Sequence, residues 1–332
     1  MSIKQFPGGV ITKSPTAPTT AAAKGIWTLG QAADFVKQGI WPRSPGAPTI
    51  GTATAVTFST ATVTFTAPTD LGTGAVTFTA TSSPAGGSGT GTSPITVTGL
   101  SALTSYTFTV TASTPGGTSP ASAASNSVTT TAEPAPTVIG QAYGGGYYAG
   151  QIGVSSVATH YLVVGPLSTA QSQLKWKNVN TATVGADSDI DGPQNTTDMV
   201  ADGNSTVYPC AHFCNDLSTG GKTDWYMPAK NELEVCYYNL KPTVNSNDTS
   251  SGINLNAIPA RASNYTSGTP PTTSATAFLL GGVEGFLNAM YWSSTEKSAS
   301  GGWSQYFING NQNYSPNKTQ SYRVRAVRRV AV

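Results

Sequence analysis

The sequence contains few charged residues. Asp, Glu, Lys and Arg make up only 10% of its 332 residues, well below the roughly 25% of ordinary globular proteins. Gly, Ser, Thr, Asn and Pro are abundant instead, so hydroxyl and amide groups keep the surface soluble. This composition is typical of β-rich proteins on extracellular or particle surfaces. The net charge of +2 provides no field that would attract nucleic acid or an anionic membrane.

Long apolar runs and a leader pattern are also missing. No run of 18 apolar residues occurs, so we expect no membrane-spanning segment. Pro7-Gly8-Gly9 interrupts the region where a secretory signal would need its apolar core. A surface-type composition without an export signal predicts a protein assembled in a host cytoplasm, on a particle released by lysis.

Cysteine and histidine are scarce. The three cysteines are an odd number, which argues against a disulfide framework. Cys210, His212 and Cys214 lie within one helical turn and suggest zinc. A structural zinc site needs four ligands, however, and the one other histidine, His160, lies far upstream. Buried free thiols are the favoured interpretation.

Signs of catalysis are weak. The sequence has neither a Gly-rich phosphate loop nor a nucleophile elbow. Glu232 and Glu234 lie two apart on a predicted helix, so they point in different directions. We therefore predict that the protein is not an enzyme.

Residues 1–44 are predicted to be a docking segment. Residues 1–24 are rich in Pro, Thr and Ala without periodicity, and should be extended or disordered until bound. A short helix is expected over residues 29–38, followed by the stop signals Gly39 and Pro42. Trp27 and Trp41 flank this helix without a local core to cover them, which predicts that they dock onto another protein.

Residues 45–132 are predicted to form an immunoglobulin-like β-sandwich. Apolar residues alternate with threonines in several short runs, for example Val63, Phe65 and Ala67. Gly99-Leu100 followed by Tyr106 resembles the fibronectin type III pattern. That resemblance implies a leucine packed beneath a tyrosine whose hydroxyl bonds back to the turn. The tryptophan usual in that family's second strand is absent, and Val63 or Phe65 would take its place.

Residues 133–332 are predicted to form an α+β domain that begins with a stiff linker at Glu133-Pro134-Ala135-Pro136. We expect two helices, at residues 208–217 and 229–239, and a long structureless loop at residues 243–276. The expected strands cover residues 144–148, 161–164, 291–294, 305–309 and 322–330. The whole chain is therefore expected to be a mainly β multidomain protein.

Three phrases occur in order in this last region: Asp224–Glu234, Tyr291–Glu296 and Tyr322–Arg329. Together they resemble the C-type-lectin-like domains that end many bacteriophage virion proteins and some bacterial collagen-like adhesins. The resemblance implies two short helices against a twisted sheet, with long loops that present a variable binding face. Residues 1–44 also look like N-terminal segments of phage virion proteins. Formylglycine-generating enzymes have a similar fold, but Cys236 is the last cysteine here, so their C-terminal cysteine pair has no counterpart.

A calcium loop is one interpretation of the aspartates in the domain. Asp187, Asp189 and Asp191 alternate before Gly192, and Asp198 falls on the twelfth position of an EF-hand pattern. The twelfth residue of that pattern is usually Glu, and no entering helix is expected. The related domains carry an Asp-Gly-x-x-Asn turn here, and this turn remains the alternative.

Arginines and tryptophans near the C-terminus have structural interpretations. A continuous strand would send Arg323, Arg325 and Arg329 to one face and Arg328 to the other. This split argues against a nucleic-acid groove, and favours pairing with Glu296 and with backbone carbonyls. Two tryptophans inside the shared phrases should belong to the core: Trp225 and Trp292.

The predicted binding face lies between residues 298 and 321. Aromatic and amide side chains gather there, of the kinds that adaptable recognition surfaces use. The candidate ligand-binding residues are Trp303, Tyr306, Asn311, Asn313 and Tyr314. The aromatics would stack on sugar rings and the asparagines would bond to sugar hydroxyls.

These expectations combine into one functional hypothesis. The protein would be a bacteriophage virion surface protein, present in many copies, with homo-oligomerisation left open. Residues 1–44 would bind other virion proteins, and the C-terminal domain would bind a glycan or receptor on the host. A purely structural capsid or tail decoration is the alternative, and a secreted bacterial adhesin is a third interpretation.

Overall fold

The computed structural model describes residues 28–38, 42–312 and 316–332. The chain divides into two compact units between Glu133 and Pro134, and each is described by itself. The first unit contains helix α1 (Leu29–Lys37), as predicted. Its first turn is capped because the Gln31 N–H donates to the Thr28 hydroxyl and the Thr28 N–H donates back to Gln31. Trp27 and Trp41 lie outside the described residues.

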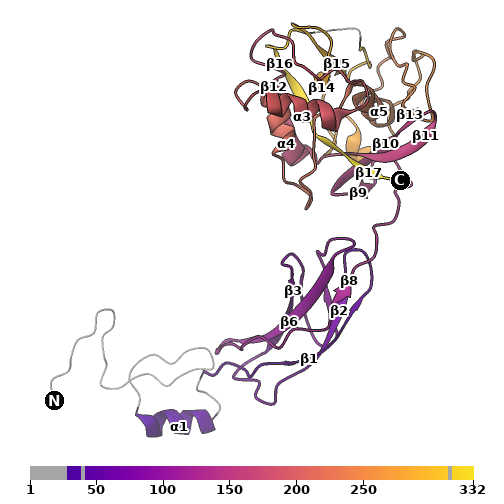
Figure 1. Ribbon diagram of the computed structural model, residues 1–332. Helices are drawn as coiled ribbons and strands as arrows, with labels where there is room; N and C mark the ends of the chain where they lie inside the picture. Colours follow the sequence, from indigo (N-terminus) through magenta and orange to yellow (C-terminus); the bar gives the residue numbers. More distant parts are fainter. Residues whose placement is uncertain (1–27, 39–41, 313–315) are drawn as a thin grey trace, which may run out of the picture. The chain divides into compact units, whose positions relative to one another are not determined.

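The predicted β-sandwich is present in this unit, with its strands between Thr49 and Thr129 (Figure 1). One sheet has the order β1-β2-β5, and the other has β4-β3-β6-β7 with β8 also paired to β6. Inward residues alternate with outward ones along β6, so every second side chain reaches the core. The strands are β1 Thr49–Ala55, β2 Ala61–Thr66, β3 Thr77–Ser83, β4 Ser88–Thr90, β5 Ile95–Val97, β6 Ser105–Thr114, β7 Gly117–Thr118 and β8 Val128–Thr129.

The predicted tyrosine contact is present. The Ser101 N–H donates to the Tyr106 hydroxyl oxygen at 2.9 Å, and Leu100 is buried beside it. Val63 and Phe65 are both in the core, in the role expected for the missing tryptophan. The pattern of the fibronectin type III corner is therefore confirmed in this chain.

The segment from Ser119 to Ser125 pairs with β6 in a way that the sequence did not predict. The N–H groups of Ser119, Ser122 and Ser125 donate to carbonyls of β6. Their hydroxyls accept the N–H groups of the same β6 residues, at 2.9–3.0 Å. The serines recur every third residue, whereas their partners on β6 recur every second residue. The two segments can still pair, because the serine hydroxyls accept the β6 N–H groups in place of backbone carbonyls.

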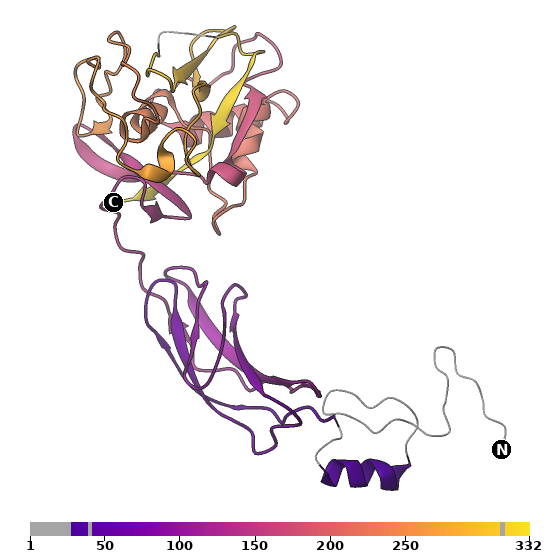
Figure 2. The same ribbon diagram turned by 180° about the vertical axis from the view of Figure 1, so that it is seen from behind.

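The second unit, the terminal domain (residues 134–332), has two sheets with helices beside them. One sheet has the order β13-β10-β11-β17, with β9 paired to β10, and the other has β12-β16-β14-β15. Helices α3 and α4 lie side by side next to the β12–β16 pair (Figures 1 and 2). The strands are β9 Ala142–Tyr143, β10 Gly146–Val154, β11 Val157–Val164, β12 Gln171–Lys175, β13 Ala257–Ile258, β14 Met290–Glu296, β15 Gly302–Tyr306, β16 Ser321–Arg325 and β17 Val327–Ala331.

The helices agree with the prediction only in part. Two expected helices are present as α4 (Pro209–Asn215) and α5 (Lys230–Leu240). Helix α3 (Gly192–Asp202) was not predicted, nor were the short α2 (Leu167–Ala170) and the 3-10 turn η1 (Thr276–Phe278). No helix among the described residues is long and apolar enough to cross a membrane.

The predicted last strand is in fact two strands that belong to different sheets. β16 pairs with β12 and β14, whereas β17 pairs with β11. Ala326 separates them, and its backbone bonds to Ala170 and Gly165 instead. The prediction of one continuous strand was wrong. The alternation of side chains in the sequence continues through Ala326, but the chain passes from one sheet to the other at this residue.

The predicted core residues are confirmed. Trp225 and Trp292 are buried, as is Trp176, which the sequence analysis did not single out. The three cysteines are free and fully buried, and burial raises the pKa of each thiol. The apolar face of α5 is buried too: Leu233, Cys236, Tyr237 and Leu240.

The expected structureless loop at residues 243–276 is packed and hydrogen-bonded. It includes β13, and Asn254 and Arg261 exchange both backbone hydrogen bonds. Asn247 and Asn254 are buried and bond to backbone carbonyls through their side-chain amides. Amide side chains thus satisfy backbone groups that no sheet ladder reaches.

Candidate functional site

Trp303 lies on β15 and is partly buried. Two ammonium groups approach its ring: Lys230 Nζ at 4.3 Å and Lys297 Nζ at 4.2 Å from the ring centroid. Such contacts stabilise a cation on an aromatic face by roughly 0.5–1 kcal/mol at exposed sites. The tryptophan surface (Trp303, Lys230 and Lys297) is therefore a cationic aromatic surface rather than a bare stacking platform.

Tyr306 and Asn311 lie at the other end of β15. The Tyr306 N–H donates to the Asn311 carbonyl at 3.0 Å, and the Gly310 N–H donates to the Tyr306 carbonyl at 2.7 Å. The side-chain amide of Asn311 bonds to the Asp248 carboxylate. We call residues 306–312 the Asn311 loop.

The structure divides the predicted binding residues. Because side chains alternate along a strand, Trp303 and Tyr306 point to opposite sides of β15. Tyr306 and Asn311 do lie together in one turn. Asn313 and Tyr314 lie outside the described residues.

The aspartates predicted to bind calcium have other roles. Asp191 caps α3 by accepting the Gln194 N–H, and Asp198 accepts the side-chain amide of Gln194. The Asp189 carboxylate pairs with Lys230 at 3.2 Å, and Asp187 is exposed. Residues 192–198 are helical, so the second half of the proposed loop does not form, and the structure does not support the calcium interpretation.

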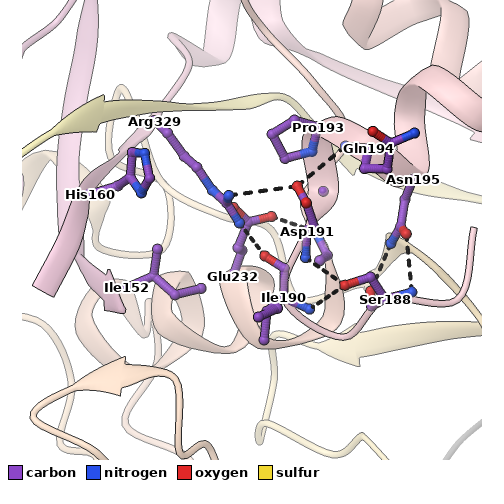
Figure 3. Close-up of polar contacts among 12 residues, drawn as sticks. Ile152, His160, Ser188, Ile190, Asp191, Pro193, Gln194, Asn195, Glu232 and Arg329 are labelled. Atoms are coloured by element: carbon purple, nitrogen blue, oxygen red, sulfur yellow. Dashed lines mark hydrogen bonds and ion pairs between the residues drawn. The ribbon is translucent and has the colours of Figure 1, made fainter. Parts of the chain in front are cut away.

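The alternative turn interpretation is closer to the structure. Asn195 is buried, and its amide accepts the Ser188 N–H and donates to the Ser188 carbonyl. Figure 3 shows Asn195 facing Ser188 across the start of α3, with Asp191 between Ser188 and Arg329. Asp191 and Asn195 therefore hold the loop from residue 187 to residue 191 against α3.

The same loop is anchored to α5 by a buried ion pair. Glu232 is fully buried and accepts the Arg329 Nε at 2.7 Å, the Tyr226 hydroxyl at 2.5 Å and the Ala229 N–H at 2.8 Å. Arg329 also donates to the Ile190 carbonyl and lies 3.6 Å from Asp191 (Figure 3). Burial raises the pKa of Glu232 although Arg329 opposes the shift.

Glu234 faces a different environment, as predicted. Its carboxylate is fully buried and binds Arg261, the Tyr265 hydroxyl at 2.6 Å and the Asn254 amide at 2.6 Å. All three partners belong to the loop at residues 243–276. Glu232 and Glu234 are thus two separate anchors, one for each long loop beside α5.

The C-terminal arginines are paired, but not with the predicted partner. Arg325 Nη2 lies 2.7 Å from Glu284, and Arg328 forms two bonds of 2.7 Å with Asp224. Glu296 pairs with Lys318 instead, at 3.2 Å. The expected bonds to backbone carbonyls are present, from Arg325 to Gly165 and from Arg328 to Gly144. The partner was wrong because the strand breaks at Ala326.

The cysteine–histidine group of α4 does not gather further ligands. His212 Nε2 lies 2.8 Å from the Gly203 carbonyl oxygen, and its Nδ1 is 3.6 Å from Asp216. Within residues 28–38, 42–312 and 316–332, no group of three or more His, Cys, Asp or Glu side chains could hold a metal ion.

Comparisons with known proteins identify two domains. Residues 46–128 match the family of the fibronectin type III domain, and residues 168–328 match the family called Lcl C-terminal domain. No curated protein matches the chain. The chain is mainly β and multidomain, and its domains suggest a protein of the surface or adhesion type.

Several solved structures resemble the sandwich. They include the FN5 domain of Drosophila Lar, with 24% identity over 27% of this chain and 99% of that chain, at a TM-score of 0.22. A domain of human fibronectin type III domain containing protein 3 has 21% identity over 29% and 94%, at 0.24. A titin fragment has 24% identity over 26% and 32%, also at 0.24. The chain spans about a third of that titin fragment.

Proposed function

From a fibronectin type III domain followed by an Lcl C-terminal domain, we propose that this protein attaches a bacteriophage particle to the surface of its host. The sandwich would act as the spacer and the terminal domain as the binding head. The low charge of the chain and the order of its domains support this proposal. Many copies on one particle would bind together, since linked sites can gain roughly 10²–10⁴ in avidity without new contacts.

The observation that carries the proposal is how the loops of the terminal domain are held. Glu234 anchors the loop at residues 243–276 through three side chains, and Asp248 holds the Asn311 loop. Burying a carboxylate is costly unless it is well paired. Holding long loops in one conformation lowers the entropy that a ligand must remove on binding. Preorganised loops of this kind suit recognition.

The proposed contacts with a host glycan come from Trp303 on one side of β15, and from Tyr306 and Asn311 on the other. Asn313 and Tyr314 follow the Asn311 loop in the sequence and belong to the same proposal. Residues 1–44, with Trp27 and Trp41, would bind the particle. Fully burying one aromatic side chain is worth roughly 1.5–3 kcal/mol, so replacing both tryptophans by Ala should reduce incorporation into particles.

Two measurements test the proposal. Antibody against the terminal domain should label purified particles in electron microscopy, and unlabelled particles would exclude a virion protein. A multimerised terminal domain should bind host cells, and binding should fall in Trp303→Ala and in Tyr306→Ala. Val157→Ala is the matched control, because Val157 is 65% exposed and lies on β11, in the sheet that does not contain β15. A labelled particle whose multimerised domain binds no host cell would establish the purely structural decoration instead.

A further inference from the structure

A second, smaller site lies next to the Asn311 loop. A cavity of about 260 Å³ opens between the last turn of α5 and the segment that follows β13, two neighbouring parts of the fold (Figure 1). Its walls include Tyr238, Arg261, Asn264, Tyr265, Thr266 and Thr269. This volume is below the roughly 300–1,000 Å³ of pockets for drug-sized ligands, so the cavity suits one small ring.

The wall of the cavity is aromatic and fixed. The Arg261 guanidinium stacks on the Tyr238 ring, with its carbon 3.9 Å from the ring centroid. The rings of Tyr238 and Tyr265 are 6.3 Å apart and inclined by 38°. The Tyr265 hydroxyl is bonded to the buried Glu234, so this ring cannot turn away from the cavity without losing that bond.

The polar wall is held equally firmly. Thr266 and Thr269 exchange backbone hydrogen bonds, and the Thr269 N–H also donates to the Thr266 hydroxyl at 2.9 Å. The buried Asn247 amide donates to the Thr266 carbonyl from behind, at 3.1 Å. These contacts keep hydroxyl-bearing residues at the mouth of the cavity in place.

The charge of the cavity favours a neutral ligand. Of the eight residues that line it, Arg261 alone is charged, and the fully buried Glu234 neutralises it. The Arg261 Nε–H is buried and has no hydrogen-bond partner among the described residues. The cavity therefore combines an aromatic wall with hydroxyl and amide groups and with an unsatisfied donor beside it, but carries no net charge.

The Asn311 loop packs against the inner side of the cavity wall. Gly310 packs so closely on the inner wall that an added Cβ would come within 2.3 Å of Tyr237 and 2.8 Å of Tyr265. Asn247, which holds Thr266, is followed directly by Asp248, which binds Asn311. The Asn311 loop and the wall of the cavity therefore support each other.

From these contacts we infer that the cavity binds a neutral monosaccharide unit, the end of a host-surface glycan. The apolar C–H face of a sugar ring packs on tyrosine, and its hydroxyls bond to threonine, asparagine and arginine groups. This inference rests on the proposed attachment function, and it names the class of ligand and the subsite. Tyr238 is the residue on which ring stacking depends.

Saturation-transfer NMR on the full chain tests the inference, with the methyl glycosides of glucose, galactose, mannose and N-acetylglucosamine as probes. We expect transfer to the ring protons of at least one glycoside. Tyr238→Leu should weaken binding roughly tenfold or more, whereas Tyr238→Phe should keep it. Ala262→Gln adds bulk at an exposed position of the rim without removing a contact, and should also reduce binding.

The control variant lies in another cavity of the same domain. Phe213→Leu removes an aromatic ring from the open cavity lined by Leu174, His212 and Leu217, and should leave the transfer unchanged. No transfer with any of the four glycosides would overturn the inference. Equal transfer in wild type, Tyr238→Leu and Ala262→Gln would do so as well.

The two proposals fail in distinguishable ways. If the multimerised domain binds host cells and Tyr238→Leu binds as well as wild type, the subsite is excluded and the attachment function stands. If the multimerised domain binds no cells but the transfer depends on Tyr238, the subsite stands and the attachment proposal fails.

Discussion

The sandwich and the terminal domain bury different kinds of polar group. In the sandwich the buried polar side chains are hydroxyls, such as Thr73, Thr114 and Thr130. The terminal domain buries a set of charged side chains: Lys177, Glu232, Glu234, Lys241, Glu284, Lys318, Arg325 and Arg328. In the sandwich unit, the ion pair Arg43–Asp70 has side chains that are 42% and 52% exposed.

The difference follows from how each region satisfies its backbone. Strand ladders pair most N–H and C=O groups of the sandwich, and short hydroxyls complete the rest. The terminal domain has long irregular segments whose carbonyls face no ladder. A buried ammonium group can donate to several carbonyls at once. Lys241 Nζ donates to the carbonyls of Asn245 and Pro270, and Lys177 Nζ donates to that of Ala182. Burial lowers the pKa of Lys241.

The largest effect should come from breaking a buried ion pair of the terminal domain. Arg325→Ala would leave the Glu284 carboxylate buried without its cation. We expect this change to lower the free energy of unfolding by about 3–5 kcal/mol, measured by denaturant titration followed by far-ultraviolet circular dichroism, which reports both domains. Arg43→Ala is the control from the other region and should cost less than about 1 kcal/mol. Equal effects of the two changes would remove the contrast between the domains.

A smaller loss is expected when a hydroxyl of the sandwich is removed. Ser122→Ala deletes the oxygen that accepts the buried Val110 N–H at 2.9 Å. An unsatisfied buried donor costs about 1–3 kcal/mol. Amide exchange of β6 in the full chain measures the change, and Ser127→Ala is the matched control because Ser127 is exposed. Unchanged protection of the Val110 amide in Ser122→Ala would show that the serine pairing is dispensable.

Acid should lower the stability of the terminal domain more than that of the sandwich. We expect this effect to be smaller than the effect of Ser122→Ala. The Tyr208 hydroxyl lowers the pKa of Asp202 below its ordinary value of 3.8. A carboxyl with a lowered folded-state pKa stabilises the fold above 3.8, and this contribution is lost as the pH falls through the folded-state pKa. Asp202 is 46% exposed, so solvent screens the effect.

Glu232 changes the free energy of unfolding with pH in the opposite direction to Asp202. Burial raises its pKa above 4.5, so its contribution is present below 4.5 and is lost as the pH rises through the raised value. The net loss from Asp202 is therefore expected only below about pH 3.8, the ordinary value of its pKa. Thermal unfolding followed against pH, with Asp202→Asn as the matched variant, measures it. The same acid dependence in wild type and variant would contradict the assignment to Asp202.

Calcium should have no effect on the stability of the terminal domain. Ligand binding raises stability only where the folded state holds a site, and Asp189 and Asp191 are engaged by Lys230 and Arg329. The midpoint of thermal unfolding should be the same with calcium and with a chelator. A rise that Asp189→Asn abolishes would restore the calcium loop.

Much of the fold could be predicted from local patterns. The sandwich alternation and the buried face of α5 follow from the periods of strands and helices. The Tyr106 contact follows from the resemblance to the fibronectin type III pattern. Helix α3 was missed because its sequence, rich in Asn, Thr and Asp, has little apolar periodicity. The Asp191 cap and Pro193 in its first turn were the available signals.

The candidate site was less predictable. The sequence predicts Trp303 and Tyr306 on one binding face, whereas strand alternation separates them. The cavity at Tyr238 and Arg261 was not predicted, because one of its walls comes from α5 and the other from a segment that was expected to be a structureless loop. Glu234, buried between them, binds Arg261 and Tyr265, and the Arg261 guanidinium stacks on Tyr238.

By itself the sequence predicted the β-sandwich and the α+β class of the terminal domain, and family resemblance predicted the tyrosine contact of the sandwich and the buried tryptophans of the terminal domain. These features depend on residues near one another in the chain or on short repeating patterns. Tertiary structure alone decided the partners of the arginines, the change of sheet at Ala326 and the cavity beside the Asn311 loop. Each of these depends on which distant segments meet, and a charged side chain pairs with whichever opposite charge the fold brings within a few ångströms.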